Sequence, residues 1–297
     1  MKAEKRSCIL NIGGGYLTRR ICRIYPLYLI TILVSLLITQ FAPGYSPRID
    51  NVTELLRHLM LLEGESIYWA IPVEFKYYAL LPVATISLYW LNKLNPFAPV
   101  AATLLAIFAI HIVWPPSETN ANSIQLGPYL GIFLLGSLTA LLCSGTTEPV
   151  VSRYAKPLAV AGWLSIFVGL MTVPSFWRLV VDPDATNQVF HRDFLFYGLL
   201  WCVSVTAATK GSRLFAAFFE LKACRFVGRV SFSVYLWHYL VVQLISRDVE
   251  IHASLQFLLV LAITFPLSWV SYQFIERPFI AWGHRTTSNW NSPTTNP

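Results

Sequence analysis

The sequence predicts an all-α protein, a polytopic membrane helix bundle of about eight transmembrane helices. Of the 297 residues, 55% are hydrophobic and 12% are charged, whereas soluble domains carry about 25% charged residues. Apolar runs of membrane-spanning length recur along the chain, and Lys and Arg gather at alternate ends of them. We therefore expect a multi-pass protein of the cell membrane, that is, the inner or plasma membrane.

Eight apolar stretches are long enough to cross a bilayer, which takes roughly 20 helical residues. They are residues 24–42, 69–91, 98–114, 126–143, 157–173, 193–209, 228–245 and 254–275. Residues 1–23 form a basic lead-in that lacks the apolar core of a signal peptide, with a flexible joint expected at glycines 13–15. Residues 281–297 are polar and are expected to form a disordered tail, so that residues 1–280 make up the transmembrane domain.

The distribution of Lys and Arg predicts that both termini are cytoplasmic. With the start inside, the inner segments hold 16 of the 22 basic residues, the outer loops hold 5, and Lys76 lies within a span. An excess of this kind on the cytoplasmic side follows the positive-inside rule. The net charge of +7 is then an orientation signal, with anionic membrane lipids as partners, and it requires no nucleic acid. The five cysteines include no CxxC pair and none in a predicted outer loop, which predicts neither a disulfide nor a metal site.

A basic run, RRICRIYPLY from Arg19, precedes the first span. On a helix Arg20 and Arg23 lie on one face, and guanidinium groups bind phosphate in a bidentate manner. Pro26 predicts a kink at the mouth of the membrane. The alternative interpretation is that these arginines only anchor the helix on the cytoplasmic side.

The second span opens with WAIPVEFKYY from Trp69. Glu74 and Lys76 fall on different faces of a helix, whereas Tyr77 and Tyr78 share the face of Glu74 and can hydrogen-bond to it. A carboxylate within the membrane indicates a functional site. The alternative is that Glu74 and Lys76 extend to the outer interface.

Ser231, Tyr235 and His238 form a polar stripe on the predicted span 228–245, at positions i, i+4 and i+7 of a helix. Such a stripe faces other helices or a wet cavity, because polar groups facing lipid are costly. His238 near mid-depth can act as a general base near pH 7, oriented by Tyr235 and Ser231. The alternative is an interhelical hydrogen bond that only stabilises the bundle, by about 1 kcal/mol.

Ser268, Tyr272 and Glu276 recur every four residues at the end of the last span, and Pro278 follows. Pro278 predicts the end of this helix and leaves Glu276 at the inner edge of the membrane. The alternative for Glu276 is an exposed ion pair worth less than about 1 kcal/mol. The remaining histidines receive no role; they are His58, His111, His191, His252 and His284.

In this order the motifs RRxxR–IYPLY, WxIPVExxYY, GRxSxSxYLWH and SYxFIERP resemble the acyltransferase-3 family of membrane acyltransferases. The resemblance runs from about Leu17 to Phe279. It implies a bundle of about ten helices that transfers acyl groups, often acetyl, from cytoplasmic acyl-CoA to hydroxyls of envelope glycans or secreted metabolites. The partners it implies are the acyl-CoA donor and a glycan or other hydroxyl acceptor, with no cofactor besides that donor substrate.

Residue by residue, the resemblance implies that Arg20 and Arg23 contact the phosphates of the donor. The candidate catalytic residues that match family motifs are Glu74, Tyr235, His238 and Glu276. The family usually opens with two further helices, and the first bears a basic residue, ten spacers and a His thought to be catalytic. No counterpart of this pattern is present, since no His here has Lys or Arg eleven positions before it. We therefore expect little acyl transfer by residues 1–297 alone, with His238 as the base that remains. The alternatives are a truncated, catalytically inactive family member and a lipid or small-molecule transporter, and acyl-CoA binding would separate a transporter from the enzyme.

Overall fold

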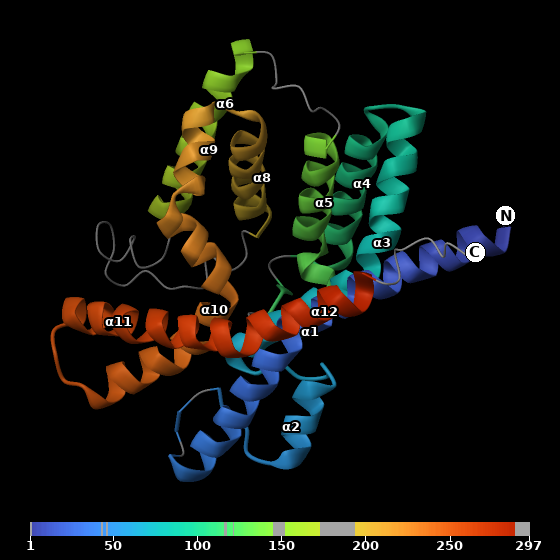
Figure 1. The fold of residues 1–297 in the computed structure, drawn as a ribbon. Coiled ribbons are helices and arrows are strands. Elements are labelled where there is room, and N and C mark those ends of the chain that lie inside the picture. Colours follow the sequence, from blue (N-terminus) through green and yellow to red (C-terminus); the bar gives the residue numbers. More distant parts are fainter. Residues whose placement is uncertain are drawn as a thin grey trace. The chain divides into compact units, whose positions relative to one another are not determined.

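The computed structural model describes residues 2–42, 44–45, 47–115, 118–120, 122–144, 152–172 and 194–288, and these residues form an all-α structure (Figure 1). The chain divides into two compact units, the first made of residues 1–72 and 226–297 and the second of residues 73–225. Each of the eight predicted spans coincides with a helix. The predicted tail beyond residue 288 and the predicted outer loop 174–192 lie outside the described residues.

The helices of the first unit come from both ends of the chain. They are α1 (Lys2–Phe41), α2 (Val52–Leu59), the 3₁₀ turn η1 (Ser66–Trp69), most of α10 (Lys222–Asp248), α11 (Ala253–Ser271), the π-helical turn η5 (Tyr272–Glu276) and α12 (Arg277–Ser288). The second unit contains α3 (Ala70–Leu94), α4 (Ala98–Val113), the 3₁₀ turn η3 (Gly127–Tyr129), α5 (Leu130–Ser144), α6 (Ser152–Met171), α8 (Phe194–Lys210) and α9 (Arg213–Glu220).

Several described helices are long and apolar enough to cross a membrane, though fewer than the eight expected. Four meet this description by length and composition, and a fifth is the pair α8 and α9 if its two helices, bent by 103°, form one broken span. The four are Gly14–Phe41, Gly127–Ser144, Tyr154–Met171 and Ala253–Ser288. The predicted spans on α3, α4 and α10 do not meet this description. Helix α4 has only 16 residues, and α3 and α10 contain the charged and polar residues of the motifs, which lower their hydropathy.

The long helix α1 differs from the sequence-based expectation. It begins at Lys2 and continues through glycines 13–15 and through Pro26, where a flexible joint and a helix boundary were predicted. Proline is tolerated inside membrane helices because neighbouring groups can satisfy the carbonyl that it leaves free. Arg20 and Arg23 therefore do lie one helical turn apart, on the same face.

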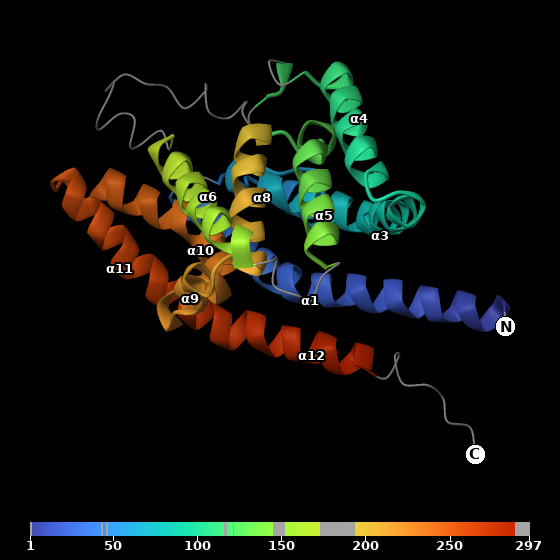
Figure 2. The same ribbon diagram turned by 90° about the horizontal axis from the view of Figure 1, so that it is seen from above.

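The C-terminal helix α12 is a second difference. Pro278 was predicted to end the last span, but it is the second residue of α12, which follows η5 without a break, and proline is tolerated inside membrane helices. Residues 281–288, predicted to belong to the disordered tail, are helical. They are ordered because α12 packs along α1 (Figure 2), which the local polarity of this segment does not reveal.

Small residues and one hydrogen bond hold α12 against α1. A Cβ built on Gly283 would lie 2.8 Å from the Cβ of Cys22 and 3.0 Å from its sulfur. Next to this contact, the guanidinium of Arg19 donates a hydrogen bond of 3.0 Å to the hydroxyl of Thr287, which is itself buried. The pairing therefore brings the basic run of α1 beside the segment that follows Glu276.

In the second unit α6 packs on α8, α8 on α5, and α5 on α4 (Figures 1 and 2). The contact between α6 and α8 requires a glycine, because a Cβ on Gly162 would lie 2.6 Å from the Cβ of Ala207. Ala159, Ala207 and Phe215 form a buried apolar cluster at this contact. Small residues of this kind let membrane helices approach closely and gain van der Waals contact.

Candidate functional site

The candidate site lies in the first unit, where α1, α10 and the turn η5 meet. Glu276 is 1% exposed and is the last residue of η5. The hydroxyl of Ser233, which is completely buried on α10, donates a hydrogen bond to Oε1 of Glu276. Helix α1, which carries Arg23, packs against the same turn η5. Glu276 is therefore a buried acidic group with a hydrogen-bond partner on α10, and not the exposed ion pair considered as its alternative.

The π turn explains why Glu276 faces inward. Thr264, Ser268 and Ser271 form a buried stripe on α11, and a regular α-helix would continue that stripe at residue 275. The turn η5 inserts one extra residue, so Glu276 occupies the inward position instead. The same seam carries a second polar contact, in which the indole N–H of Trp237 on α10 donates to the hydroxyl of Ser271 at 2.8 Å.

His238 lies on α10 one turn beyond Val234 and Tyr235. Its Nδ1 atom is 2.8 Å from the carbonyl oxygen of Tyr235 and 3.1 Å from that of Val234. Carbonyl oxygens only accept hydrogen bonds, so neutral His238 carries its proton on Nδ1 and presents a lone pair on Nε2. Within the described residues Nε2 has no hydrogen-bond partner. This tautomer can take a proton from an alcohol at Nε2.

Tyr235 and Ser231 do not contact His238 through their hydroxyls. The Tyr235 hydroxyl donates to the carbonyl of Ile67 in η1, although its ring lies beside the imidazole with 6.0 Å between centroids. Ser231 is exposed and donates to the carbonyl of Gly228 at 3.0 Å. The backbone carbonyls of α10 therefore orient His238, whereas hydroxyl groups were predicted to do so.

The predicted donor-binding arginines have different surroundings on α1. The guanidinium carbon of Arg20 lies over the ring of Tyr16, 5.3 Å from its centroid. Arg23 is exposed. Cation–π stacking keeps the Arg20 head group in a defined place.

Glu74 belongs to the second unit and is described with it. The hydroxyl of Tyr78 donates to Oε2 of Glu74 at 3.1 Å, as the spacing of these residues predicted. Tyr77 instead donates to the carbonyl of Phe133 at 3.0 Å and packs face to face with the Phe133 ring. The ammonium of Lys76 donates to the carbonyl of Ile124 at 2.7 Å, away from Glu74.

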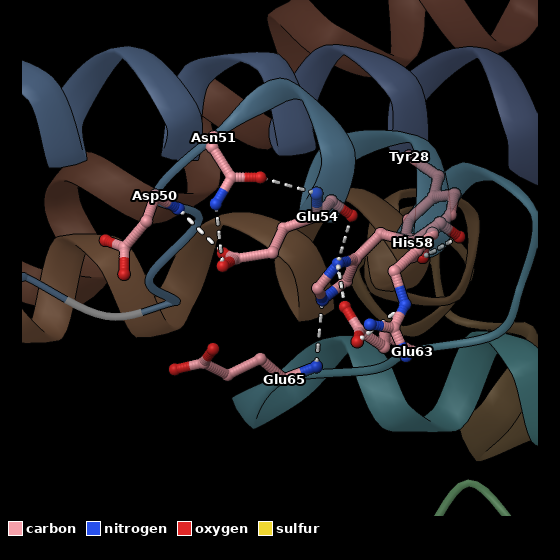
Figure 3. A network of polar contacts seen from close by, with 8 residues as sticks. Tyr28, Asp50, Asn51, Glu54, His58, Glu63 and Glu65 are labelled. Carbon is pink, nitrogen blue, oxygen red and sulfur yellow. Dashed lines mark hydrogen bonds and ion pairs between the residues drawn. The ribbon is translucent and has the colours of Figure 1, made fainter.

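A second polar network surrounds His58, a residue that sequence reasoning left without a role (Figure 3). His58 is 2% exposed, and both ring nitrogens are engaged: Nδ1 donates to the carbonyl of Glu54 at 2.9 Å, and Nε2 accepts from the backbone N–H of Glu65 at 3.1 Å. Tyr28 of α1 donates to the carbonyl of His58 at 3.0 Å, and Tyr25 donates to that of Leu59.

These contacts give the two tyrosines of the IYPLY motif a structural role, because they satisfy carbonyls at the C-terminal end of α2 that have no partner within the helix. The periodicity of α1 does not reveal this role, since Tyr25 and Tyr28 resemble the interfacial aromatic residues common in membrane proteins.

Comparison with known proteins places these motifs in a family. A model of the acyltransferase domain matches residues 11–273, a range that includes Arg20, Arg23, Glu74 and His238 and ends three residues before Glu276. The peptidoglycan O-acetyltransferase OatA of Listeria monocytogenes is 26% identical over 219 residues, which cover 71% of this chain and 34% of the relative.

The O-acetyltransferase OatA of Staphylococcus aureus is 23% identical over 220 residues, covering 71% of this chain and 35% of that protein. A putative O-acetyltransferase of S. aureus is 22% identical over 233 residues, or 75% of this chain and 37% of the relative. The chain thus spans about a third of the length of these curated relatives. No solved structure matches. Because the family model covers most of the sequence, the chain belongs to the acyltransferase family of integral membrane enzymes.

Proposed function

We propose that this protein transfers an acetyl group from cytoplasmic acyl-CoA to a hydroxyl of a cell-envelope carbohydrate. Membership of the acyltransferase family supports the reaction class. The names of the relatives support acetyl as the group transferred and, for the Listeria protein, peptidoglycan as the acceptor. Since this chain corresponds to about a third of those proteins, donor and acceptor are both part of the proposal.

The observation that carries this proposal is the meeting of three motifs within one unit. Helix α1, which carries Arg23 of the first motif, packs against η5, and Ser233 of the third motif donates a hydrogen bond to Glu276 of the last. More than 200 residues of sequence separate the first motif from the others, so only folding brings them together. Arg20 and Arg23, one turn apart on α1, suit the phosphates of an acyl-CoA.

In the proposed reaction His238 is the general base. The alcohol proton passes to Nε2 of His238 as the alcohol oxygen attacks the thioester carbonyl. A carbon–oxygen bond forms, the carbon–sulfur bond breaks, and the departing thiolate recovers the proton from the imidazolium, which yields the ester and CoA. General base catalysis of this kind is typically worth about 10²–10⁴-fold in rate.

The other candidate residues support this step in different ways. Tyr235 packs beside His238 and holds η1 through the Ile67 carbonyl. Glu276 accepts the hydrogen bond of Ser233 and is proposed as a catalytic carboxylate of the first unit. Glu74, with Tyr78 on its carboxylate, is proposed as a catalytic carboxylate of the second unit.

The proposal includes the membrane topology, with eight spans and both termini in the cytoplasm. The 16-to-5 distribution of basic residues supports this orientation. It puts Arg20 and Arg23 on the side where acyl-CoA is available, so that the acceptor hydroxyl approaches from the outer side.

The test is acetyl transfer from radiolabelled acetyl-CoA to peptidoglycan fragments by the full chain in lipid nanodiscs. Parent protein is compared with His238→Ala and with His284→Ala, which removes an exposed imidazole on α12. Turnover that is lost with His238→Ala and kept with His284→Ala supports the proposal. Turnover that survives His238→Ala contradicts the assignment of the base, and a parent protein that binds acetyl-CoA without turnover fits the inactive alternative.

A further inference from the structure

A polar cavity of about 250 Å³ lies in the second unit, in the loop that joins α4 to η3. The side chains that line it supply an indole, a carboxylate, two amides and two hydroxyls; they belong to Trp114, Glu118, Asn120, Gln125, Thr119 and Ser123. The cavity between α5 and α8 is different, because most of its lining residues are apolar, as suits a surface that faces lipid. The loop cavity is therefore suited to a polar ligand and not to a lipid chain.

Trp114 gives this cavity an aromatic wall. A Cβ built on Gly127 would lie 2.4 and 2.5 Å from the two carbon atoms that the rings of the indole share, so Gly127 packs against the face of the ring. Trp114 is nevertheless 40% exposed. One face of the indole is thus fixed by backbone and leaves the other for a ligand. An aromatic face is electron-rich and attracts C–H groups, which the flat face of a sugar ring presents.

Three polar side chains of the cavity are available for hydrogen bonds. Among the described residues, the side chains of Glu118, Asn120 and Gln125 have no hydrogen-bond partner. Amides both donate and accept and a carboxylate accepts, which matches a ligand with several hydroxyls. Of the described residues that line the cavity, Glu118 is the only charged one. A lone negative charge disfavours phosphate and other anions, so the ligand is neutral.

The loop is held to α3 by Lys76, whose ammonium donates to the carbonyl of Ile124 at 2.7 Å. In the proposed topology this loop lies on the outer side of the membrane, from which the acceptor hydroxyl approaches. Pockets for drug-sized ligands have volumes of about 300–1,000 Å³, so a cavity of about 250 Å³ suits a single sugar residue.

We propose that this cavity binds one neutral sugar residue of the carbohydrate acceptor, with Trp114 stacked on the sugar ring and Glu118, Asn120 and Gln125 bonded to its hydroxyls. This inference rests on the proposed function, because it takes the acceptor to be a carbohydrate. It predicts a particular defect: loss of the indole weakens binding of the acceptor and leaves binding of the donor unchanged.

The first test is a ligand-observed NMR titration of the full chain in nanodiscs with chitobiose, the neutral disaccharide of N-acetylglucosamine. Trp114→Ala should raise the Kd about tenfold, and Trp114→Phe, which keeps an aromatic face, should recover most of the affinity. Gln125→Ala should raise the Kd about fivefold, as expected for losing a hydrogen bond. Trp201→Ala is the matched control, because Trp201 is an exposed tryptophan of the same unit that lines the apolar cavity, and it should bind like the parent protein.

Acetyl transfer to peptidoglycan fragments gives a second measurement. Trp114→Ala should raise the KM for the acceptor about tenfold without changing the KM for acetyl-CoA, whereas a role in folding alone would reduce the amount of active protein and change neither KM. If Trp114→Ala does not fold, Gln125→Ala, which changes an exposed side chain, supplies the same comparison. Absence of chitobiose binding by the parent protein, or equal Kd values for the parent and the cavity variants, would overturn the inference. A parent protein with no acetyl transfer contradicts the proposed function instead, and the chitobiose titration then decides the sugar site alone.

Discussion

Gly283 of α12 lies so close to Cys22 of α1 that a Cβ on the glycine would come within 2.8 Å of the Cys22 Cβ. The adjacent contact joins Arg19 to Thr287, so this part of the interface contains both a close approach of two backbones and a hydrogen bond. Through it, the segment that carries Glu276 is held beside the basic run of α1. The geometry of the candidate site therefore depends on a glycine outside it.

We predict that Gly283→Val destabilises the protein by about 1–3 kcal/mol, because the added side chain forces α1 and α12 apart. The measurement is thermal unfolding in detergent, followed by intrinsic fluorescence. Gly228→Ala is the matched control in the same unit, since a Cβ on Gly228 would meet nothing within 4 Å. An unfolding temperature for Gly283→Val equal to that of the control would show that the two helices do not pack as described.

His58→Ala should also destabilise the protein. Removal of the imidazole leaves the backbone N–H of Glu65 without its acceptor and opens a cavity beside Tyr68, whose ring centroid lies 6.1 Å from that of His58. A buried donor without a partner costs about 1–3 kcal/mol, to which the cavity adds. Chemical denaturation with His284→Ala as the exposed control measures the difference. Equal midpoints for the two variants would mean that the network in Figure 3 contributes nothing to stability.

Replacement of both Arg20 and Arg23 by Ala should weaken acyl-CoA binding by about tenfold or more for each arginine, because each can form charge-assisted hydrogen bonds with phosphate. Lys at both positions should recover only part of the affinity, since an ammonium lacks the bidentate geometry of a guanidinium. Calorimetric titration with CoA measures the effect. Arg285→Ala, on the exposed side of α12, controls for the loss of positive charge. If the alanine variant binds CoA like the parent protein, the two arginines only anchor the helix.

The proposed orientation predicts opposite accessibility for the two ends of α10. In a cysteine-free background, Glu250→Cys just beyond the helix should react with an impermeant thiol reagent in intact cells, whereas Lys222→Cys at its start should react only after the cells are permeabilised. Both positions are exposed in the structure, so burial would not explain a difference. The reverse labelling pattern would contradict the topology.

Much of the helical framework could be predicted from the sequence, because length and hydropathy are local properties. All eight apolar stretches are helical, and the spacing of Glu74 and Tyr78 gave their hydrogen bond correctly. The short helix α2 was missed, since its eight residues have no membrane-spanning length and its order depends on Tyr25 and Tyr28 of α1. The prediction of disorder at residues 281–288 was wrong. It was based on the polar composition of this segment, whereas these residues are helical and α12 packs on α1.

The sequence by itself determined the membrane class, the helical content and the ordered motifs, because each depends on residues near one another in the chain. Only the tertiary structure decided which polar side chains meet. The structure shows that Ser233, and not Ser231, is the buried serine of α10, and that one π turn brings Glu276 inward to accept its hydrogen bond. A single extra residue in a helical turn redirects the side chains that follow by about 100°, and a change of this kind leaves no trace in composition or periodicity.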